Sequence, residues 1–282
     1  MHDIKYIHDK DFKYNEAIIE GLKSYNKSQA GYREKDYRHF YIFEDGTLIG
    51  ACHTKMAVDW CHIKNIYYTN IDVLKALMND LRTYYKDKVE GIRFNSVFPK
   101  RVDDFKSIGF VEKGKLKNMP EGGENVFLLN TDFDVYETNR DYEKKSSDDP
   151  VQPYDKVMKK ENRKIRQSLN FSAEVVDIQY VVLDGDRFIG GVYGNFQYDY
   201  LFVNVLYVDE HYRGQNIASN LMDMIETEAK RRGVHNIYIT TYEFQALGFY
   251  KKRGYEEVME IYDYPKGFKE FTVHKRLDSN QP

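Results

Sequence analysis

The sequence predicts a mixed α/β protein of two tandem domains of one kind, each with a central mixed, largely antiparallel sheet flanked by helices. Three observations lead to this fold class. Short segments recur in the same order in both halves of the chain, helical and strand periodicities alternate within each half, and 282 residues suffice for two domains of ordinary size.

The internal repeat rests on four pairs of matching segments. Two pairs have the same separation along the chain: LIG (48–50) with FIG (188–190), and IKNIYY (63–68) with VNVLYV (203–208). Two later pairs share a slightly larger separation: FKSIGF (105–110) with YKKRGY (250–255), and MPEG (119–122) with YPKG (264–267). Matches in one order at nearly constant separation indicate two copies of one domain. The change of separation places five additional residues in the second copy, between its strand 203–208 and Gly254.

The elements of each copy follow from the periodicity of its apolar residues. The expected long helices are residues 12–25 and 71–85 in the first copy, and 154–169 and 217–232 in the second. The expected late strands of the second copy are residues 237–240, 255–262 and 269–275. Residues 138–153 are charged, contain Ser and Pro and lack apolar periodicity, so they are predicted to link a first domain at 1–137 to a second at 154–282.

Composition excludes several classes of protein. A net charge of −3 gives no bulk electrostatic reason to bind nucleic acid or an acidic membrane, and 156–167 is the one basic stretch. The charged N-terminal residues and the lack of a long apolar run predict a cytoplasmic protein. Two Cys-His pairs, at Cys52 and Cys61, lack the spacing of a zinc site, so no metal is expected.

A loop in the second copy predicts an anion site. The apolar strand 201–208 ends in charge, and Arg213, Gly214, Gln215 and Asn216 then lead directly into a helix. A helix N-terminus offers free N–H groups and a positive dipole end, Gly lets a ligand approach the backbone, and Asn tolerates positive φ. The first copy has no such loop, and Asp72 would place a carboxylate there. An ordinary solvated turn is the alternative.

These residues resemble the GNAT acetyltransferases. The second copy has the Arg/Gln-x-x-Gly-x-Gly/Ala loop as Arg213 to Ala218, and further on Ala246, Tyr250 and Gly254 stand at the spacing of the family's second motif. The sequence departs from the pattern at Asn216, where the family usually has Gly. The resemblance covers the second copy strongly and the first only as a scaffold, so the first is expected to be a degenerate copy without the cofactor loop.

The resemblance implies an N-acetyltransferase that moves an acetyl group from acetyl-CoA to a primary amine by direct attack. It implies that the second domain is catalytic and that CoA is the co-substrate, with no metal. The pyrophosphate would meet the loop, and the pantetheine arm would lie along the strand before it. The implied cofactor-binding residues are Leu206, Tyr207, Val208, Arg213, Gly214, Gln215, Asn216, Ile217, Ala218 and Ser219.

The resemblance implies the catalytic acid, whereas the catalytic base has only candidates. Tyr250 matches the family's acid, since a phenol with a pKa of about 10 is protonated at neutral pH and can donate to a thiolate; the first copy has Phe105 there. Asp199 and Glu243 are candidate bases. The alternatives are a hairpin at 197–200 with a solvated Asp199, and deprotonation of the amine by ordered water.

Two other functions stay open. One is a non-catalytic acyl-CoA-binding or interaction protein with the GNAT fold. The other, aminoacyl transfer to peptidoglycan precursors by paired domains of this fold, requires a tRNA surface, which the net charge argues against. A small-molecule or peptide amine is the expected acceptor, and the loop 263–268 is expected to contribute to its specificity. Neither the acceptor's identity nor the oligomeric state can be read from the sequence.

Overall fold

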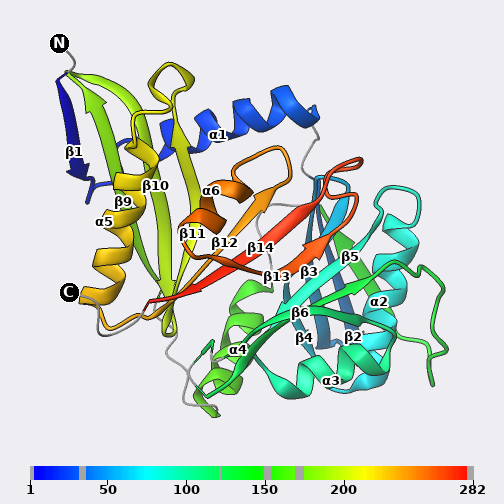
Figure 1. The fold of residues 1–282 in the computed structure, drawn as a ribbon. Helices are drawn as coiled ribbons and strands as arrows, with labels where there is room; N and C mark the ends of the chain where they lie inside the picture. Colours follow the sequence, from blue (N-terminus) through cyan, green and yellow to red (C-terminus); the bar gives the residue numbers. More distant parts are fainter. Residues whose placement is uncertain are drawn as a thin grey trace.

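The computed structural model describes residues 3–31, 36–117, 119–120, 122–148, 154–168 and 175–277, and within these it contains two seven-stranded mixed sheets with helices against them (Figure 1). This confirms the predicted fold class. The order in the first sheet is β6-β7-β5-β4-β3-β2-β8, and in the second sheet β1-β9-β10-β11-β12-β14-β13.

The strands of the first sheet are β2 (Asp36–Glu44), β3 (Thr47–Ala57), β4 (Trp60–Tyr68), β5 (Gly91–Ser96), β6 (Val111–Lys117), β7 (Glu124–Asn130) and β8 (Glu143–Ser147). Those of the second sheet are β1 (Ile4–His8), β9 (Val175–Asp184), β10 (Arg187–Gln197), β11 (Tyr200–Val208), β12 (Asn236–Tyr242), β13 (Glu256–Ile261) and β14 (Glu270–Arg276). The helices are α1 (Asn15–Ala30), α2 (Ile71–Tyr85), α3 (Pro99–Ser107), α4 (Asp155–Ser168), α5 (Ile217–Arg231) and α6 (Leu247–Lys252).

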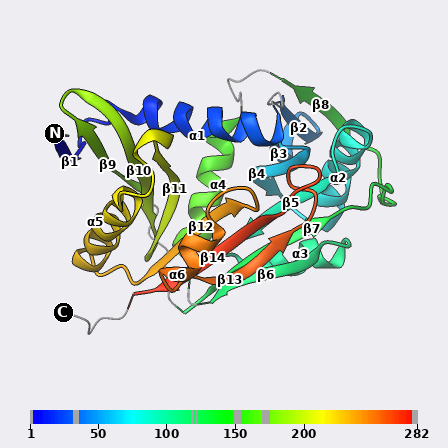
Figure 2. The same cartoon turned by 45° about the horizontal axis from the view of Figure 1, so that its top comes forward.

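The two copies exchange their first strand and first helix. Strand β1 pairs antiparallel with β9 of the second sheet, and α1 lies across β10 and β11 (Figures 1 and 2). In return, β8 pairs with β2 of the first sheet, and α4 contacts β4. Each sheet is therefore completed by a strand and a helix that the other half of the chain supplies.

This exchange differs from the predicted domain boundaries. The sequence places residues 1–30 in the first domain, yet the side chain of Ile18 is fully buried and its Cδ1 lies 2.6 Å from where a Cβ on Gly191 would stand. The predicted linker includes residues 143–147, yet they form a strand; residues 149–153 of that linker lie outside the described residues. An amphipathic helix pattern shows that a face is buried but does not show which sheet buries it.

In each sheet, the one parallel pair of strands separates partway along its length. Strands β11 and β12 pair from Tyr200–Asn236 to Val203–Ile239, and beyond that point β12 pairs with β14 while β11 pairs only with β10. A register shift places Asn204 in a β-bulge at the point of separation. In the first sheet β4 and β5 separate after His62–Arg93, and the corresponding bulge is at Lys64.

The two sheets meet through a shared apolar cluster, drawn from both copies, that includes Trp60, Leu116, Phe127, Tyr200, Met259, Ile261 and Tyr264. Polar contacts cross the same boundary. Arg93 Nη1 lies 2.6 Å from Glu270 Oε1, with both side chains largely buried, and Trp60 Nε1 donates to the carbonyl of Asp263 at 3.1 Å. Among the described residues, no helix combines the length and apolar character needed to cross a bilayer.

Because of this exchange, substitution of two neighbouring isoleucines in α1 should have different effects on stability. Ile18→Ala should lower the free energy of unfolding by about 2–5 kcal/mol, because Ile18 is fully buried against the second sheet. It should also weaken acetyl-CoA binding, since α1 covers the cavity described below. Ile19→Ala is the matched control, because Ile19 is 38% exposed. Chemical denaturation and calorimetric titration measure both effects, and equal losses in the two variants would contradict this packing of α1.

Candidate active site

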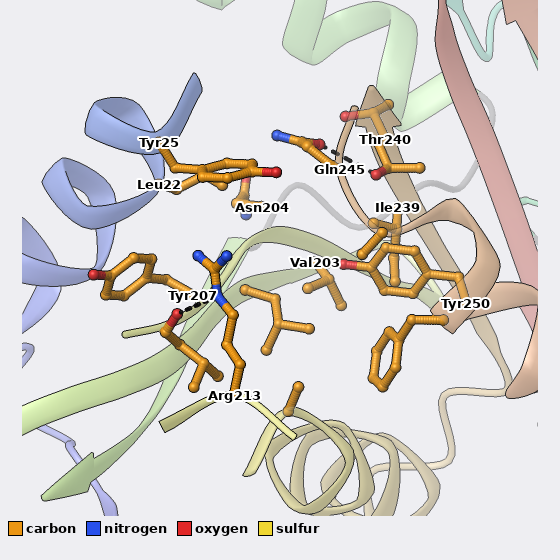
Figure 3. Close-up of a pocket in the computed structure, with 16 residues that line it drawn as sticks. Leu22, Tyr25, Val203, Asn204, Tyr207, Arg213, Ile239, Thr240, Gln245 and Tyr250 are labelled. Atoms are coloured by element: carbon orange, nitrogen blue, oxygen red, sulfur yellow. Dashed lines mark hydrogen bonds between the residues drawn. The ribbon is translucent and has the colours of Figure 1, made fainter. Parts of the chain in front are cut away.

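A cavity of about 360 Å³ opens where β11 and β12 separate (Figure 3). Its floor is formed by β11 and β12, and α1 covers it from above. Its lining residues are Leu22, Tyr25, Val203, Asn204, Leu206, Tyr207, Val208, Arg213, Ala218, Ile239, Thr240, Thr241, Gln245, Ala246, Phe249 and Tyr250. Because the β11 backbone beyond Val203 has no ladder on the β12 side, its N–H and C=O groups on that side can pair with a ligand, as an added strand would.

A second hollow, of about 220 Å³, adjoins this cavity at the start of α5 and shares Val208, Arg213, Ala218 and Phe249 with it. The N-cap residue Asn216 is left-handed, with φ 60° and ψ 9°, and its side chain makes no capping hydrogen bond. The first N–H groups of a helix have no partner within the helix. This N-terminus therefore presents free donors and a positive dipole end to the hollow.

The corresponding helix end in the first copy is already occupied. Asn70 is extended, and its Oδ1 accepts from the N–H groups of Asp72 and Val73 at 3.0 and 3.1 Å. The Asp72 carboxylate in turn accepts from the N–H of Asn139 at 2.8 Å and from the Tyr142 hydroxyl at 2.7 Å. The two helix ends therefore differ in capping, and Asp72 also anchors the segment that follows β7.

Tyr250 stands in the short helix α6 and lines the large cavity, with its hydroxyl pointing inward (Figure 3). The residue is only 5% exposed, and burial raises its pKa well above the usual value for a phenol. The hydroxyl is therefore protonated at neutral and mildly alkaline pH. Phe105, its counterpart, is a core residue whose ring centroid lies 4.3 Å from that of Phe94.

Three polar residues that the sequence analysis did not identify, Tyr25, Asn26 and Gln245, fix the covering helix to the second copy, and Tyr25 also meets the predicted Arg213. Arg213 Nε donates to the Val208 carbonyl at 3.2 Å, which places its guanidinium 5.0 Å from the centre of the Tyr25 ring. Tyr25 donates to the carbonyl of Phe244 at 2.8 Å, and Gln245 Nε2 donates to Asn26 at 2.6 Å. The sequence around Tyr25 carries no motif, so only the packing of α1 on the second sheet reveals it.

The structure separates the two candidate bases from Tyr250. Asp199 lies in the turn between β10 and β11, at the opposite end of β11 from the cavity; the hairpin is observed as the alternative predicted, but the Asp199 carboxylate is partly buried and not solvated. Glu243 is exposed, and its carboxylate accepts from the N–H of Lys269 at 3.2 Å. Neither residue lines either hollow. Asn204, Thr240 and Gln245 lie there instead.

The implied cofactor-binding residues are brought together with one exception. Leu206, Tyr207, Val208, Arg213 and Ala218 line the large cavity, and Gly214, Asn216, Ile217 and Ser219 line the hollow beside it. Gln215 lines neither.

The loop 263–268 lies against the first copy. Lys266 pairs with Glu90 at 2.8 Å, and the Tyr264 hydroxyl lies 2.7 Å from His62 Nε2. Burial is the main reason why the pKa of His62 is well below its usual range, so this imidazole is neutral. Phe268 packs on Phe244, with ring centroids 4.9 Å apart. A role of this loop in specificity stays a prediction.

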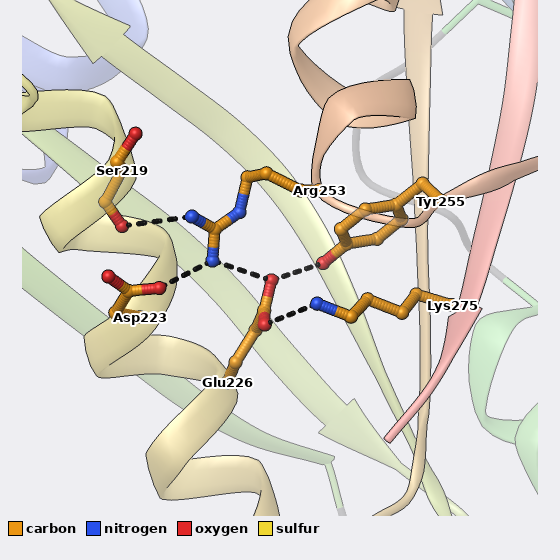
Figure 4. Close-up of polar contacts among 6 residues, drawn as sticks. All are labelled: Ser219, Asp223, Glu226, Arg253, Tyr255 and Lys275. Carbon is orange, nitrogen blue, oxygen red and sulfur yellow. Dashed lines mark hydrogen bonds and ion pairs between the residues drawn. The ribbon is translucent and has the colours of Figure 1, made fainter. Parts of the chain in front are cut away.

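A buried carboxylate connects α6, the helix of Tyr250, to α5 through hydrogen bonds (Figure 4). Glu226 of α5 is 8% exposed and accepts from Arg253 at 3.1 Å, from the Tyr255 hydroxyl at 3.0 Å and from Lys275 at 2.8 Å. Arg253 follows directly after α6 and also donates to Asp223 at 2.6 Å. The distance between α5 and α6 is thereby fixed from outside the cavity.

Within the described residues no group of three or more His, Cys, Asp or Glu side chains is arranged to hold a metal ion. Cys52 and Cys61 are buried free thiols, and burial raises the pKa of both.

Comparison with known proteins agrees with this geometry. Residues 137–255 match the acetyltransferase (GNAT) family. Blasticidin-S acetyltransferase of Streptomyces morookaense is 31% identical over 118 residues, which are 41% of this chain and 87% of that protein. Acetyltransferase Atu2258 of Agrobacterium fabrum is 35% identical over 83 residues, 29% of this chain and 61% of that protein. The crystal structure of an acetyltransferase from Bacillus cereus is 29% identical, with a TM-score of 0.43, and covers 46% of this chain and 96% of that one.

The residues that match the family model, 137–255, include the uncapped helix end at Asn216, and the relatives indicate an acyltransferase. The chain belongs to the GNAT acetyltransferase family, whose members transfer an acetyl group from acetyl-CoA.

The left-handed backbone at Asn216 can be tested by substitution. Asn216→Gly should leave the dissociation constant of CoA within a few fold of its present value, because Gly adopts this conformation freely. Asn216→Val should raise the constant about tenfold, because a left-handed conformation costs an L-residue about 1–2 kcal/mol. Calorimetric titration with CoA gives both values. Equal affinities in the two variants would show that the backbone at this position does not shape the site.

The hydrogen bonds around Arg253 predict that its two carboxylate partners, Glu226 and Asp223, contribute differently to stability. Glu226→Gln should lower the free energy of unfolding by about 1–3 kcal/mol, because it removes the charge that Arg253 and Lys275 contact. Asp223→Asn should cost less than about 1 kcal/mol, since the Asp223 side chain is 65% exposed. Denaturant titration compares the two. A larger loss for Asp223→Asn would show that the buried carboxylate does not hold the helices together.

Proposed function

We propose that this protein is an N-acetyltransferase that acetylates a primary amine of a small molecule or peptide, with its second copy as the catalytic unit. The observation that carries the proposal is a pair of adjoining hollows that share four lining residues. They lead from the uncapped N-terminus of α5, along the unpaired edge of β11, to the Tyr250 hydroxyl.

The residues of these hollows fit acetyl-CoA. The N–H groups of Gly214 to Ala218 suit the pyrophosphate, since the helix end is uncapped and positive. The backbone of β11 beyond Val203 suits the amides of the pantetheine arm, and the apolar side chains of Leu206 and Phe249 suit its methylene groups. When bound, acetyl-CoA supplies the thioester carbonyl carbon that the amine attacks.

The transfer needs one proton donor and one proton acceptor. The nitrogen lone pair of the neutral amine forms the new C–N bond, the C–S bond breaks, and Tyr250 donates its proton to the departing sulfur. Its raised pKa keeps that proton available across the range in which an amine becomes neutral. No Asp or Glu lines the described walls of either hollow, so the proton of the amine leaves through water.

Substitution of Tyr250 tests the proposal. Tyr250→Phe removes only the hydroxyl, so kcat should fall about 10²-fold or more while the affinity for acetyl-CoA stays unchanged. Tyr207→Phe is the matched control, because Tyr207 lines the same cavity and its hydroxyl points away from Tyr250 (Figure 3). Thiol release with a panel of amines, blasticidin S among them, measures turnover. Tight acetyl-CoA binding without turnover on any amine would favour a non-catalytic acyl-CoA-binding protein.

A further inference from the structure

The first copy contains a cavity of its own, of about 420 Å³, at the place where β4 and β5 separate. This is the location that the acetyl-CoA cavity has in the second sheet. Lys64 at the bulge of β4 and Asn204 at the bulge of β11 are equivalent positions of the internal repeat, and each lines its own cavity. The volume suits a small molecule.

This cavity lacks the groups that suit an acyl-CoA in the second copy. The helix end that would hold a pyrophosphate is capped by Asn70. Tyr68, the counterpart of Val208, donates to the Asp104 carboxylate at 2.8 Å and does not line the cavity. Phe105 is fully buried in the core and offers no hydroxyl. A ligand of the first copy must therefore belong to another chemical class.

Apolar residues of the acetyl-CoA cavity are replaced by polar ones here. Asn162 of α4 covers the first sheet where Leu22 of α1 covers the second, and the two are equivalent positions of the repeat. Arg101 is likewise the counterpart of Ala246. Arg101 donates to Asn162, and Asn162 donates to Asn65 of β4, so a chain of hydrogen bonds crosses the cavity wall from α3 through α4 to the sheet.

The charge on the walls has one sign. Lys64, Arg101 and Lys159 line the cavity, and no Asp or Glu stands among its described lining residues. Lys159 pairs with Asp155 at 2.6 Å, whereas Lys64 makes no ion pair in the part of the chain that the structure describes. Lys64 as a whole residue is exposed, while partial burial of its ammonium group, with Lys55 and Arg93 nearby, lowers its pKa. A bound anion would offset this unfavourable environment.

The remaining walls are aromatic and amide-bearing. The second copy contributes Tyr198, Tyr200 and Tyr238, and the first contributes Phe94 and Phe98. Asn95, Asn125 and Gln197 add hydrogen-bonding groups. Such walls suit a ligand that has a flat ring next to an anionic group.

From these walls we propose that the cavity of the first copy binds a small organic anion, a carboxylate or phosphate ester on a flat ring, at a site separate from that of acetyl-CoA. Lys64 and Lys159 face the anionic group, and the tyrosines contributed by the second copy lie against the ring. The proposal does not depend on the acetyltransferase activity of the second copy.

Binding of two probes to the full chain tests the proposal. Benzoate and phenyl phosphate share a ring and differ in the anionic group, so calorimetric titration with each identifies the preferred one. Saturating CoA should leave the dissociation constant of the preferred probe within about twofold. The double variant Lys64→Gln/Lys159→Gln should raise that constant at least tenfold, with circular dichroism confirming the fold.

The control is Lys55→Gln/Lys160→Gln, which removes the same charge from neighbouring lysines that do not line the cavity. The dissociation constant of the preferred probe for this control variant should stay within about threefold of its value for the unmodified chain. Three results would overturn the proposal: no binding of either probe at tens of millimolar, equal losses in the two double variants, or displacement of the probe by CoA. Binding of either probe with the expected pattern supports it, and the identity of that probe decides between carboxylate and phosphate.

Discussion

The separation of β11 from β12 is the constraint on which the site depends. Four residue pairs hold the two strands together, and the bulge at Asn204 then turns β11 away, so that a length of backbone is left without a sheet partner on one side. An unpaired strand edge is normally a liability that a protein covers. Here α1 covers it from one side, and a cavity of about 360 Å³ remains beside the unpaired edge. The helix start at Asn216 and the tyrosine at 250 lie at this cavity because both follow strands of the parted pair.

The exchange of first strands and helices makes the two copies interdependent. Helix α1, which lies over the cavity of the second copy, precedes β2 in the sequence. Helix α4, which lies over the cavity of the first copy, comes between β8 and β9 in the sequence. Contacts such as Arg93–Glu270 then fix the sheets to each other. Loss of either copy would therefore leave the other without its own cover. The first copy therefore contributes to the second copy's cavity although its own helix end is capped.

The parts of the structure that local chemistry determines can be predicted from the sequence. Helix α5 begins at Ile217 because the loop before it contains Gly214 and Asn216, which adopt the positive φ that such an entry needs. Periodicity predicts α2 at its observed bounds for a similar local reason. The sequence does not predict that α1 packs on the second sheet, because the apolar pattern that includes Leu22 and Tyr25 is the same whichever sheet the helix contacts. Asp199 and Glu243 are poor candidates for a related reason, since a carboxylate near a strand end carries no signal of the direction it faces.

The two copies also show how little sequence change separates a phosphate site from a closed helix end. Both helices begin after an asparagine. Asn70 is extended, with φ −155° and ψ 175°, so its side chain can reach the first N–H groups and satisfies them itself. Asn216 is left-handed, so its side chain makes no such bond and the same groups stay available. The segment between the preceding strand and this asparagine is longer in the second copy and contains Gly214, which also has a positive φ. The backbone conformation of the N-cap asparagine thus decides whether its own side chain caps the helix.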